Sequence, residues 1–140
     1  MAAAHERLVL HVDGGARGNP GPAAIGVVFS TPEGEQVDEL AQTIGVATNN
    51  VAEYQALLRG LERATALGAR EVQVINDSEL VAKQVNGVYK VKHPAMQPLH
   101  AQALAALAGF ERWSISSVPR AQNAGADRLV NQALDAALSR

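Results

Sequence analysis

Apolar positions in the first third of the chain predict three neighbouring strands. Residues 8–12 are largely apolar on both faces of an extended chain, which is typical of a strand in the middle of a sheet. Residues 24–30 form a second apolar run, and residues 31–34 have the composition of a turn that closes a hairpin. Residues 35–44 mix polar and apolar positions, so we expect an edge strand there. These three strands are therefore predicted to be antiparallel.

The remaining two thirds predict helices that alternate with two further strands. In residues 51–67, apolar side chains recur three, four and seven positions apart, as on one face of a helix, and Gly68 follows. The other predicted elements are strands at 71–76 and 111–118 and helices at 78–85, 99–108 and 124–138. The order βββαβααβα makes the long helix a crossover to a strand parallel to the first. We therefore expect an α/β fold with a five-stranded mixed sheet flanked by helices, three strands antiparallel and then two parallel.

Composition narrows the class of protein. The 140 residues are 47% hydrophobic and contain no linker-like stretch, so we expect one domain over residues 1–140. The absence of cysteine excludes disulfides, thiol catalysis and cysteine-based zinc sites, and the four histidines lack metal-ligand spacing. The longest apolar run, 103–110, is too short to cross a membrane, and the first residues lack the features of a signal peptide. A cytoplasmic location without a membrane partner is expected.

The net charge of −2 says little about partners by itself. Proteins that bind nucleic acids usually carry a basic face. In this chain positive charge is concentrated locally, at Lys83, Lys90, Lys92 and His93.

Four carboxylates lie at junctions between predicted elements. Asp13 ends the first strand, Glu53 lies in the first turn of the long helix, Asp77 follows the fourth strand, and Asp127 lies early in the last helix. Ends of elements converge at one side of the sheet in many α/β active sites. Four acids brought together there cannot all remain ionised without a cation. Oxygen ligands favour a hard divalent ion, Mg²⁺ or Mn²⁺.

Each acid also has a structural interpretation. Asn50 can cap the long helix, with Glu53 as the acid of a capping box. Asp77 can cap the following helix, and Asp127 can complement the dipole of the last helix. The structural interpretation is weakest for Asp13, because an acid at the end of a doubly buried strand needs solvent, a partner or a metal.

The glycine-rich segment 14–22 differs from a dinucleotide-binding fingerprint. Its glycines recur every three residues, and it leads through two prolines into a strand rather than a helix. One interpretation is a wide hairpin loop. The other is that Gly14, Gly15 and Asn19 allow a sugar-phosphate backbone to lie against exposed amides. The residues alone do not decide between the two.

Four motifs, in order along the chain, closely resemble type 1 ribonuclease H. They are Asp13-Gly14-Gly15 with Gly18-Asn19-Pro20-Gly21, Thr48-Asn49-Asn50 with Glu53, Asn76-Asp77-Ser78, and Pro119-Arg120 with Asn123, Ala126 and Asp127. The match covers about residues 7–138. The resemblance implies a ribonuclease H-like fold. It also implies an endonuclease that hydrolyses the RNA strand of RNA–DNA hybrids with little sequence preference and leaves 5′-phosphate and 3′-hydroxyl ends.

The resemblance assigns the four acids to two Mg²⁺ ions, for which Mn²⁺ can substitute. It implies that Asp13 bridges both ions and that Asp127 helps to hold the ion that activates water. Glu53 and Asp77 would hold the ion that stabilises the leaving 3′ oxygen. Two ions roughly 4 Å apart can clamp the attacking and leaving oxygens in this way.

The same resemblance implies a substrate-binding surface. The residues that would line the minor groove of the hybrid are Gly14, Gly15, Asn19, Asn49 and Asn50, and Thr48 would contact a DNA phosphate. Small residues and amides suit a groove that offers 2′-hydroxyls and base edges but little sequence information.

Three features depart from the family pattern. Arg120 stands where well-known bacterial enzymes carry a histidine, and because arginine stays charged we expect an electrostatic or product-handling role. Glu79 replaces a glutamine that reads a base edge, and an ionised carboxylate only accepts hydrogen bonds. The basic, tryptophan-bearing helix of many members is replaced by residues 86–94. We expect weaker hybrid binding, with Lys90 and Lys92 as partial substitutes.

Two other functions compete with this one. The first is another nuclease of the same superfamily, such as a resolvase or integrase catalytic domain, against which the glycine loop and the Asn-Asn-x-x-Glu motif argue together. The second is a nucleic-acid-binding module with a degenerate site, against which the complete acidic set argues. The sequence leaves open whether double-stranded RNA is also cut, and whether a further domain follows Arg140.

Overall fold

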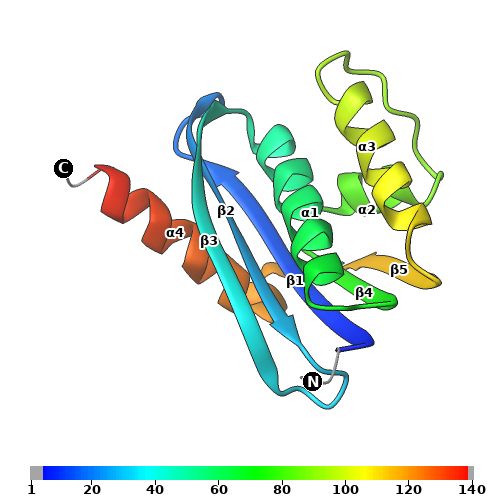
Figure 1. The fold of residues 1–140 in the computed structure, drawn as a ribbon. Helices are drawn as coiled ribbons and strands as arrows, with labels where there is room; N and C mark the ends of the chain where they lie inside the picture. Colours follow the sequence, from blue (N-terminus) through cyan, green and yellow to red (C-terminus); the bar gives the residue numbers. More distant parts are fainter. Residues whose placement is uncertain (1–4, 139–140) are drawn as a thin grey trace.

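One mixed sheet of five strands organises residues 5–138, which are the residues described by the structure, a computed structural model (Figure 1). The strands are β1 (Arg7–Ala16), β2 (Gly21–Ser30), β3 (Gln36–Ala47), β4 (Glu71–Asn76) and β5 (Arg112–Ser117). Their order across the sheet is β3-β2-β1-β4-β5, with β1–β2 and β2–β3 antiparallel and β1–β4 and β4–β5 parallel. The predicted central strand, edge strand and mixed sheet are confirmed.

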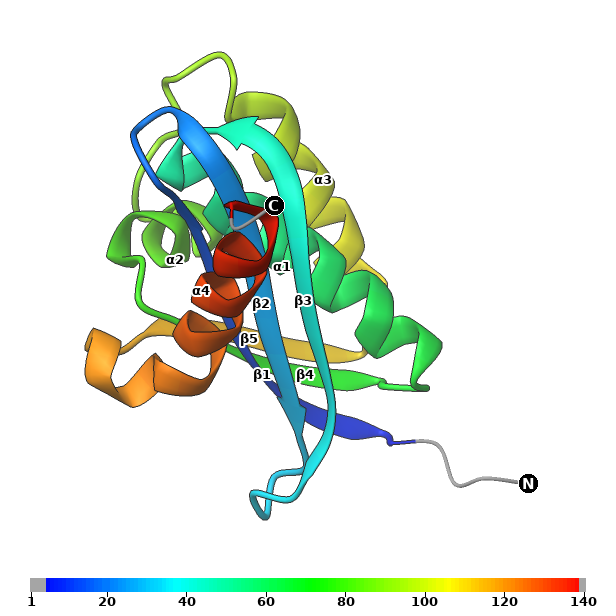
Figure 2. The ribbon, with the colours of Figure 1, turned by 90° about the vertical axis from the view of Figure 1, so that its left-hand side faces the viewer.

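Helices cover both faces of the sheet. They are α1 (Asn49–Ala66), α2 (Glu79–Val85), α3 (Gln97–Ala108) and α4 (Ala124–Leu138), with a short 3₁₀ turn, η1 (Arg120–Asn123), before α4. In two views at right angles, α1 and α3 lie on one side of the sheet and α4 crosses the other (Figures 1 and 2). The predicted element order is therefore confirmed. No helix within the described residues is both long and apolar enough to span a membrane.

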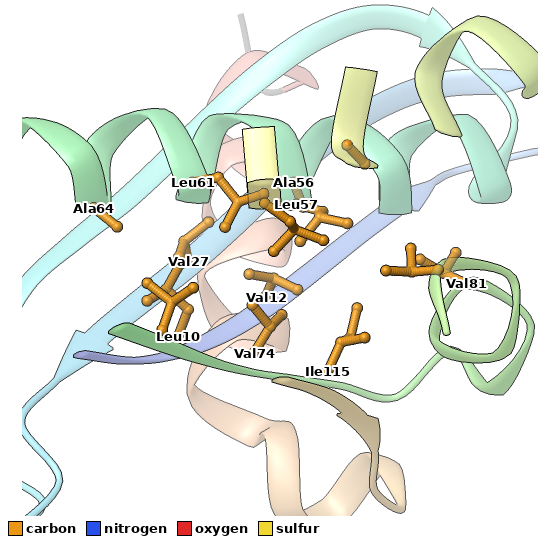
Figure 3. Close-up of a cluster of buried hydrophobic side chains, with 14 of the residues drawn as sticks. Leu10, Val12, Val27, Ala56, Leu57, Leu61, Ala64, Val74, Val81 and Ile115 are labelled. Atoms are coloured by element: carbon orange, nitrogen blue, oxygen red, sulfur yellow. The ribbon is translucent and has the colours of Figure 1, made fainter. Parts of the chain in front are cut away.

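The main core lies between the sheet and α1 (Figure 3). Alternate residues of the strands, such as Leu10, Val12 and Val27, point toward Leu57 and Leu61 on the apolar stripe of α1. These side chains are almost completely buried, and burying one of this size contributes roughly 1.5–3 kcal/mol. Helix α1 is thereby held firmly against β1.

Two glycines allow the helices on opposite faces to approach the sheet closely. A Cβ atom on Gly14 would overlap the backbone of Ala52 on α1, and a Cβ on Gly26 would overlap the carbonyl oxygen of Ala126 on α4. Gly26 pairs with Asp13 across β1 and β2. Both close approaches therefore bring helices to the part of β1 that carries Asp13.

Several predicted boundaries need correction. Strand β1 does not end at Asp13 but continues to Ala16, because Gly14–Ala16 pair with β2 residues that the sequence assigned to the loop or the next strand. The connection to β2 is therefore only residues 17–20, so the interpretation of a wide hairpin loop was wrong. Helix α1 begins at Asn49, which places Glu53 in its second turn rather than its first.

The other boundary differences are small. Strand β3 extends to Ala47, and β5 is one residue shorter than predicted at each end. Helix α3 starts at Gln97 because Pro98 is compatible with the first turn of a helix, where an amide hydrogen is not needed. The fourth strand and the last helix have the predicted bounds.

Candidate active site

Three of the four predicted acids meet at one end of the sheet. Asp13 comes from β1, Glu53 from α1, and Asp77 directly follows β4. One carboxylate oxygen from each lies within 4.8 Å of the other two. The convergence follows from the topology, because β1 and β4 are parallel neighbours and α1 packs on β1.

Asp127 lies beside this group rather than inside it. It sits in the first turn of α4 and lines the same open hollow as Asp13, Glu53 and Asp77. Its charge is close enough to raise the pKa of Asp13. The hollow therefore gathers all four acids, of which three form the compact cluster.

Two buried oxygens of the cluster lack hydrogen bonds. The backbone amide of Gly14 donates to Oε1 of Glu53 over 2.9 Å, but Oε2 of Glu53 has no donor. Oδ2 of Asp77 also accepts no hydrogen bond. An unsatisfied buried acceptor is costly, and a set made only of carboxylate oxygens matches the preferences of Mg²⁺ and Mn²⁺. The residues present thus fit a divalent cation.

Burial and mutual repulsion shift the protonation of the cluster. Burial raises the pKa of Asp13 to about 7, and the charges of Asp77 and Asp127 add to the effect. Burial raises the pKa of Glu53 well above its ordinary value, with a further contribution from the charge of Asp13. Without a cation, this cluster therefore retains protons at a pH where ordinary carboxylates have lost them.

We predict that metal-free protein loses stability as the pH rises through this range. Below about pH 4, Asp13 is protonated in both the folded and the unfolded protein. Between about pH 4 and pH 7 only the folded protein keeps this proton, so each rise in pH favours unfolding. The loss should be on the order of 1–3 kcal/mol between about pH 5 and pH 8. Denaturant unfolding in EDTA measures it. Added Mg²⁺ should restore more stability at the higher pH, and equal restoration at both would contradict the account.

The structural interpretations of two acids were wrong. Oγ1 of Thr48, not the side chain of Asn50, accepts the amide of Val51 and caps α1. Glu53 therefore belongs to no capping box and is free to accept from Gly14. Likewise Ser78, not Asp77, caps α2 through the amide of Val81. The caps are supplied one or two residues away, which leaves both carboxylates available to the cluster.

The asparagines of the predicted substrate surface tie the first hairpin to α1. The backbone amide of Asn49 donates to the side-chain oxygen Oδ1 of Asn19 over 3.0 Å. The backbone amide of Ala16 donates to the side-chain oxygen Oδ1 of Asn49 over 2.8 Å. Both oxygens are thus engaged, and among the described residues neither side-chain amide nitrogen has a partner. Exposed Asn50 lines the hollow together with Asn49 and Gly15, so these residues adjoin the acids.

Arg120 overhangs the cluster from η1. Its side chain is 78% exposed, and Nε lies 3.5 Å from Oδ2 of Asp77. The partners named in the alternative interpretation, Asp127 and Glu111, were wrong, because Arg120 pairs with Asp77 and Glu111 pairs with Arg70. A fixed positive charge therefore borders the hollow.

Comparisons with known proteins match this geometry. The family model described as "Reverse transcriptase-like" matches residues 11–133. The crystal structure of RNase H1 from Halobacterium salinarum superposes with a TM-score of 0.90 at 46% identity, covering 92% of this chain and 98% of that one. The chain belongs to the ribonuclease H family. LC11-RNase H1, solved in complex with an RNA/DNA hybrid, gives a TM-score of 0.90 at 44% identity and covers 94% of this chain and 99% of that one.

A longer relative of this ribonuclease H family member comes from Mycobacterium tuberculosis. The bifunctional protein Rv2228c is 51% identical over 132 residues, which is 94% of this chain but only 36% of that protein. The chain thus spans about a third of the length of the mycobacterial relatives it matches. Whether a further domain follows Arg140, which the sequence left open, concerns residues outside the described range.

Five residues that the ribonuclease H resemblance made candidates do not line the acidic hollow. Asn19 and Thr48 lie near it, since Asn19 accepts from Asn49 and Thr48 caps α1. The other three are Glu79, Lys90 and Lys92. Glu79 is exposed and pairs with Lys83, whose Nζ lies 2.6 Å from Oε1. Lys90 lines a separate hollow near α2 and α3, and Lys92 is exposed in the segment before α3. Glu79 is thus on α2 itself, and Lys90 and Lys92 lie in the segment that follows α2.

The structure adds residues that the ribonuclease H motifs alone did not single out for a role. Asn123, 1% exposed, donates from Nδ2 to the carbonyl of Val12 over 2.8 Å and so fastens η1 next to Asp13. Arg17 lines the hollow and pairs with Asp135 on α4. The sequence signal for Asn123 was its place in the fourth motif, and no sequence signal paired Arg17 with Asp135.

Proposed function

We propose that this chain is an endonuclease that hydrolyses the RNA strand of RNA–DNA hybrids and leaves 5′-phosphate and 3′-hydroxyl ends. The observation that carries the proposal is the cluster of Asp13, Glu53 and Asp77, in which two buried oxygens lack hydrogen bonds. Such a cluster is costly unless a cation neutralises it. Membership of the ribonuclease H family gives the reaction class, and the hybrid bound to LC11-RNase H1 gives the substrate class.

The four acids would hold two Mg²⁺ ions, with Mn²⁺ able to replace them. When bound, the ions would supply activation of the attacking water and stabilisation of the leaving 3′ oxygen. Asp13, central in the sheet, is best placed to contact both. Asp127 would serve the water side, and Glu53 and Asp77 the leaving-group side. In this assignment the fold positions the ligands before substrate arrives, so little reorganisation is needed.

Arg120 would hold the scissile or departing phosphate. Its guanidinium stays charged throughout the accessible pH range and presents several donors to phosphate oxygens. Its exposure and its position beside Asp77 leave it able to contact a substrate at the mouth of the hollow. It would act by binding and orienting phosphate rather than by transferring a proton.

The rim of the hollow would read the shape of the hybrid. Gly15, Asn49 and Asn50 present small side chains and amide groups that suit a minor groove lined by 2′-hydroxyls. Asn19, which accepts from the backbone amide of Asn49, would extend this surface beyond the hollow. Gly14 would contribute mainly by letting α1 approach β1. Thr48 would contact a DNA phosphate through its hydroxyl hydrogen, because in the cap of α1 only its oxygen is engaged, as an acceptor.

The DNA strand would continue toward the surface beyond α2. Lys90 and Lys92 would contribute nonspecific attraction to its phosphates there. Glu79 is held by Lys83 and would not repeat the base contact of a glutamine. We therefore propose hybrid binding that is weaker, and less steeply dependent on salt, than in relatives with a basic helix, because fewer phosphates are neutralised.

One set of incubations tests this function against its rivals. A labelled RNA–DNA hybrid, double-stranded RNA and the two single strands are incubated with the protein in Mg²⁺ or in EDTA. The proposal predicts cutting of the hybrid RNA in Mg²⁺ alone, with no cutting of single strands. Binding without cutting would instead support a degenerate nucleic-acid-binding module. Preferential cutting of DNA would support another nuclease of the superfamily, and cutting of double-stranded RNA would add a second substrate.

A further inference from the structure

Two buried polar side chains, one on α1 and one on α2, are neither proposed ligands nor part of the substrate surface. Tyr54 on α1 is fully buried and Gln84 on α2 is 4% exposed. The hydroxyl of Tyr54 donates a hydrogen bond of 2.6 Å to Oε1 of Gln84. A buried hydroxyl and a buried amide are both costly without partners. The bond therefore fixes both side chains and the separation of the two helices at this point.

Each member of the pair is closely connected to an acid of the cluster. Tyr54 directly follows Glu53, so a rigid α1 moves the two side chains together. Helix α2 begins two residues after Asp77, and the capping bond from Ser78 fixes that junction. The bond between Tyr54 and Gln84 thus links the helix that carries Glu53 to the helix that extends from Asp77.

Other connections between these helices are slight. Helix α1 packs mainly on β1, β2 and α3, and its direct contact with α2 is small. His100 on α3 supports the pair, since its Nε2 lies 3.1 Å from the carbonyl oxygen of Gln84 and its ring meets Tyr54 edge-on. A carbonyl only accepts, so Nε2 carries the proton in this bond. The hydrogen bond between Tyr54 and Gln84 is the principal buried polar link from α1 to α2.

We propose that Tyr54 and Gln84 are positioning residues that hold Glu53 and Asp77 at the separation a divalent cation requires. The inference rests on the proposed divalent-ion chemistry but not on which nucleic acid is cut. Removal of residues that orient metal ligands without binding the metal typically lowers metal affinity or activity by roughly 10- to 100-fold. The same range is expected here.

The first test is binding of Mn²⁺ to the whole chain without substrate, measured by isothermal titration calorimetry. Tyr54→Phe keeps the ring and deletes the hydroxyl, and it should raise the Kd for Mn²⁺ roughly tenfold or more. The Mg²⁺ concentration for half-maximal hybrid cleavage should rise in proportion, whereas kcat at saturating Mg²⁺ should change little. An unchanged Kd for Mn²⁺ in folded Tyr54→Phe would overturn the proposal.

A double-variant cycle separates positioning from general stability. Gln84→Met removes the acceptor and leaves the Tyr54 hydroxyl buried without a partner, just as Tyr54→Phe leaves the Gln84 amide oxygen without a donor, so each single variant should destabilise the protein. The double variant removes both groups and should recover part of that stability. Its affinity for Mn²⁺ should nevertheless stay as low as in either single variant, because all three lack the same bond. Recovery of affinity together with stability would refute positioning.

Phe29→Leu provides the matched control. Phe29 is fully buried in the same core, lies on β2 opposite Leu10 of β1, and is a residue of neither α1 nor α2. At a similar loss of stability, Phe29→Leu should leave the affinity for Mn²⁺ unchanged. A weakening equal to that of Tyr54→Phe would refute the proposal.

If the wild type binds Mn²⁺ but cuts no hybrid, the proposed function fails while the positioning role still stands on the calorimetry. If the wild type binds no Mn²⁺, both fail.

Discussion

Replacement of Asp13 by asparagine is expected to abolish hybrid cleavage while the fold remains intact. The amide keeps the shape of the side chain but removes the charge that would bridge the ions. Loss of that ligand should reduce turnover at least about 1,000-fold, equivalent to about 4 kcal/mol of transition-state stabilisation. Initial rates on a short labelled hybrid at saturating Mg²⁺ measure the effect, and circular dichroism shows whether folding is matched.

The same substitution should leave the stability of the metal-free protein unchanged or higher. Burial and neighbouring carboxylates raise the pKa of Asp13 to about 7, so an ionised Asp13 opposes folding above that pH. Asparagine removes this opposition. Asp38→Asn is the control, because it deletes a carboxylate that pairs with Arg63, outside the acidic hollow. Retained cleavage by folded Asp13→Asn would exclude Asp13 as the bridging ligand.

Replacement of Arg120 by alanine should lower turnover roughly 10- to 100-fold, as expected for loss of one charged group that binds the reacting phosphate. Binding of Mn²⁺ should be nearly unchanged, because Arg120 contacts Asp77 over 3.5 Å without being a ligand. Because arginine does not titrate, no limb of the pH–rate profile near pH 6–7 should disappear in the variant. Steady-state kinetics over a range of pH measure both effects.

A closely matched control exists for Arg120. Arg112, at the start of β5, has a side chain that is 79% exposed, against 78% for Arg120, and it pairs only weakly with Glu71 over 4.0 Å. Arg112→Ala removes an equally exposed charge outside the acidic hollow and should leave turnover unchanged. Arg120→Lys keeps the charge but loses the planar arrangement of donors, so an intermediate rate is expected. Wild-type turnover in Arg120→Ala would leave only a surface ion pair worth under about 1 kcal/mol.

The fold could be predicted from the sequence because its periodic signals are strong and local. The apolar stripe of α1 and the short strands β4 and β5 have one reasonable assignment each. The ends of elements were harder, because glycine and small residues suit both strand and loop. Gly14–Ala16 lie in β1 only because β2 lies alongside to pair with them. That pairing is a tertiary effect, which local composition does not record.

The acids of the site could be predicted, but their immediate partners could not. Thr48, Asn49 and Asn50 are three consecutive residues that can each cap a helix, and only the extended backbone at Thr48 decides among them. The hydrogen bond between Tyr54 and Gln84 joins positions 30 residues apart. The bond from Asn123 to Val12 joins positions 111 apart. Contacts at such separations depend on the assembled fold and leave no periodic trace in the sequence.

The most direct test of the central claim is an analysis of the cut ends of a hybrid whose RNA strand is labelled at its 5′ end. In Mg²⁺ the account predicts internal cuts in the RNA strand alone. The labelled fragments should carry a 3′-hydroxyl that a polymerase can extend, and no cuts should form in EDTA or with Asp13→Asn. Fragments with 3′-phosphate ends, or cleavage that survives removal of divalent ions, would contradict it.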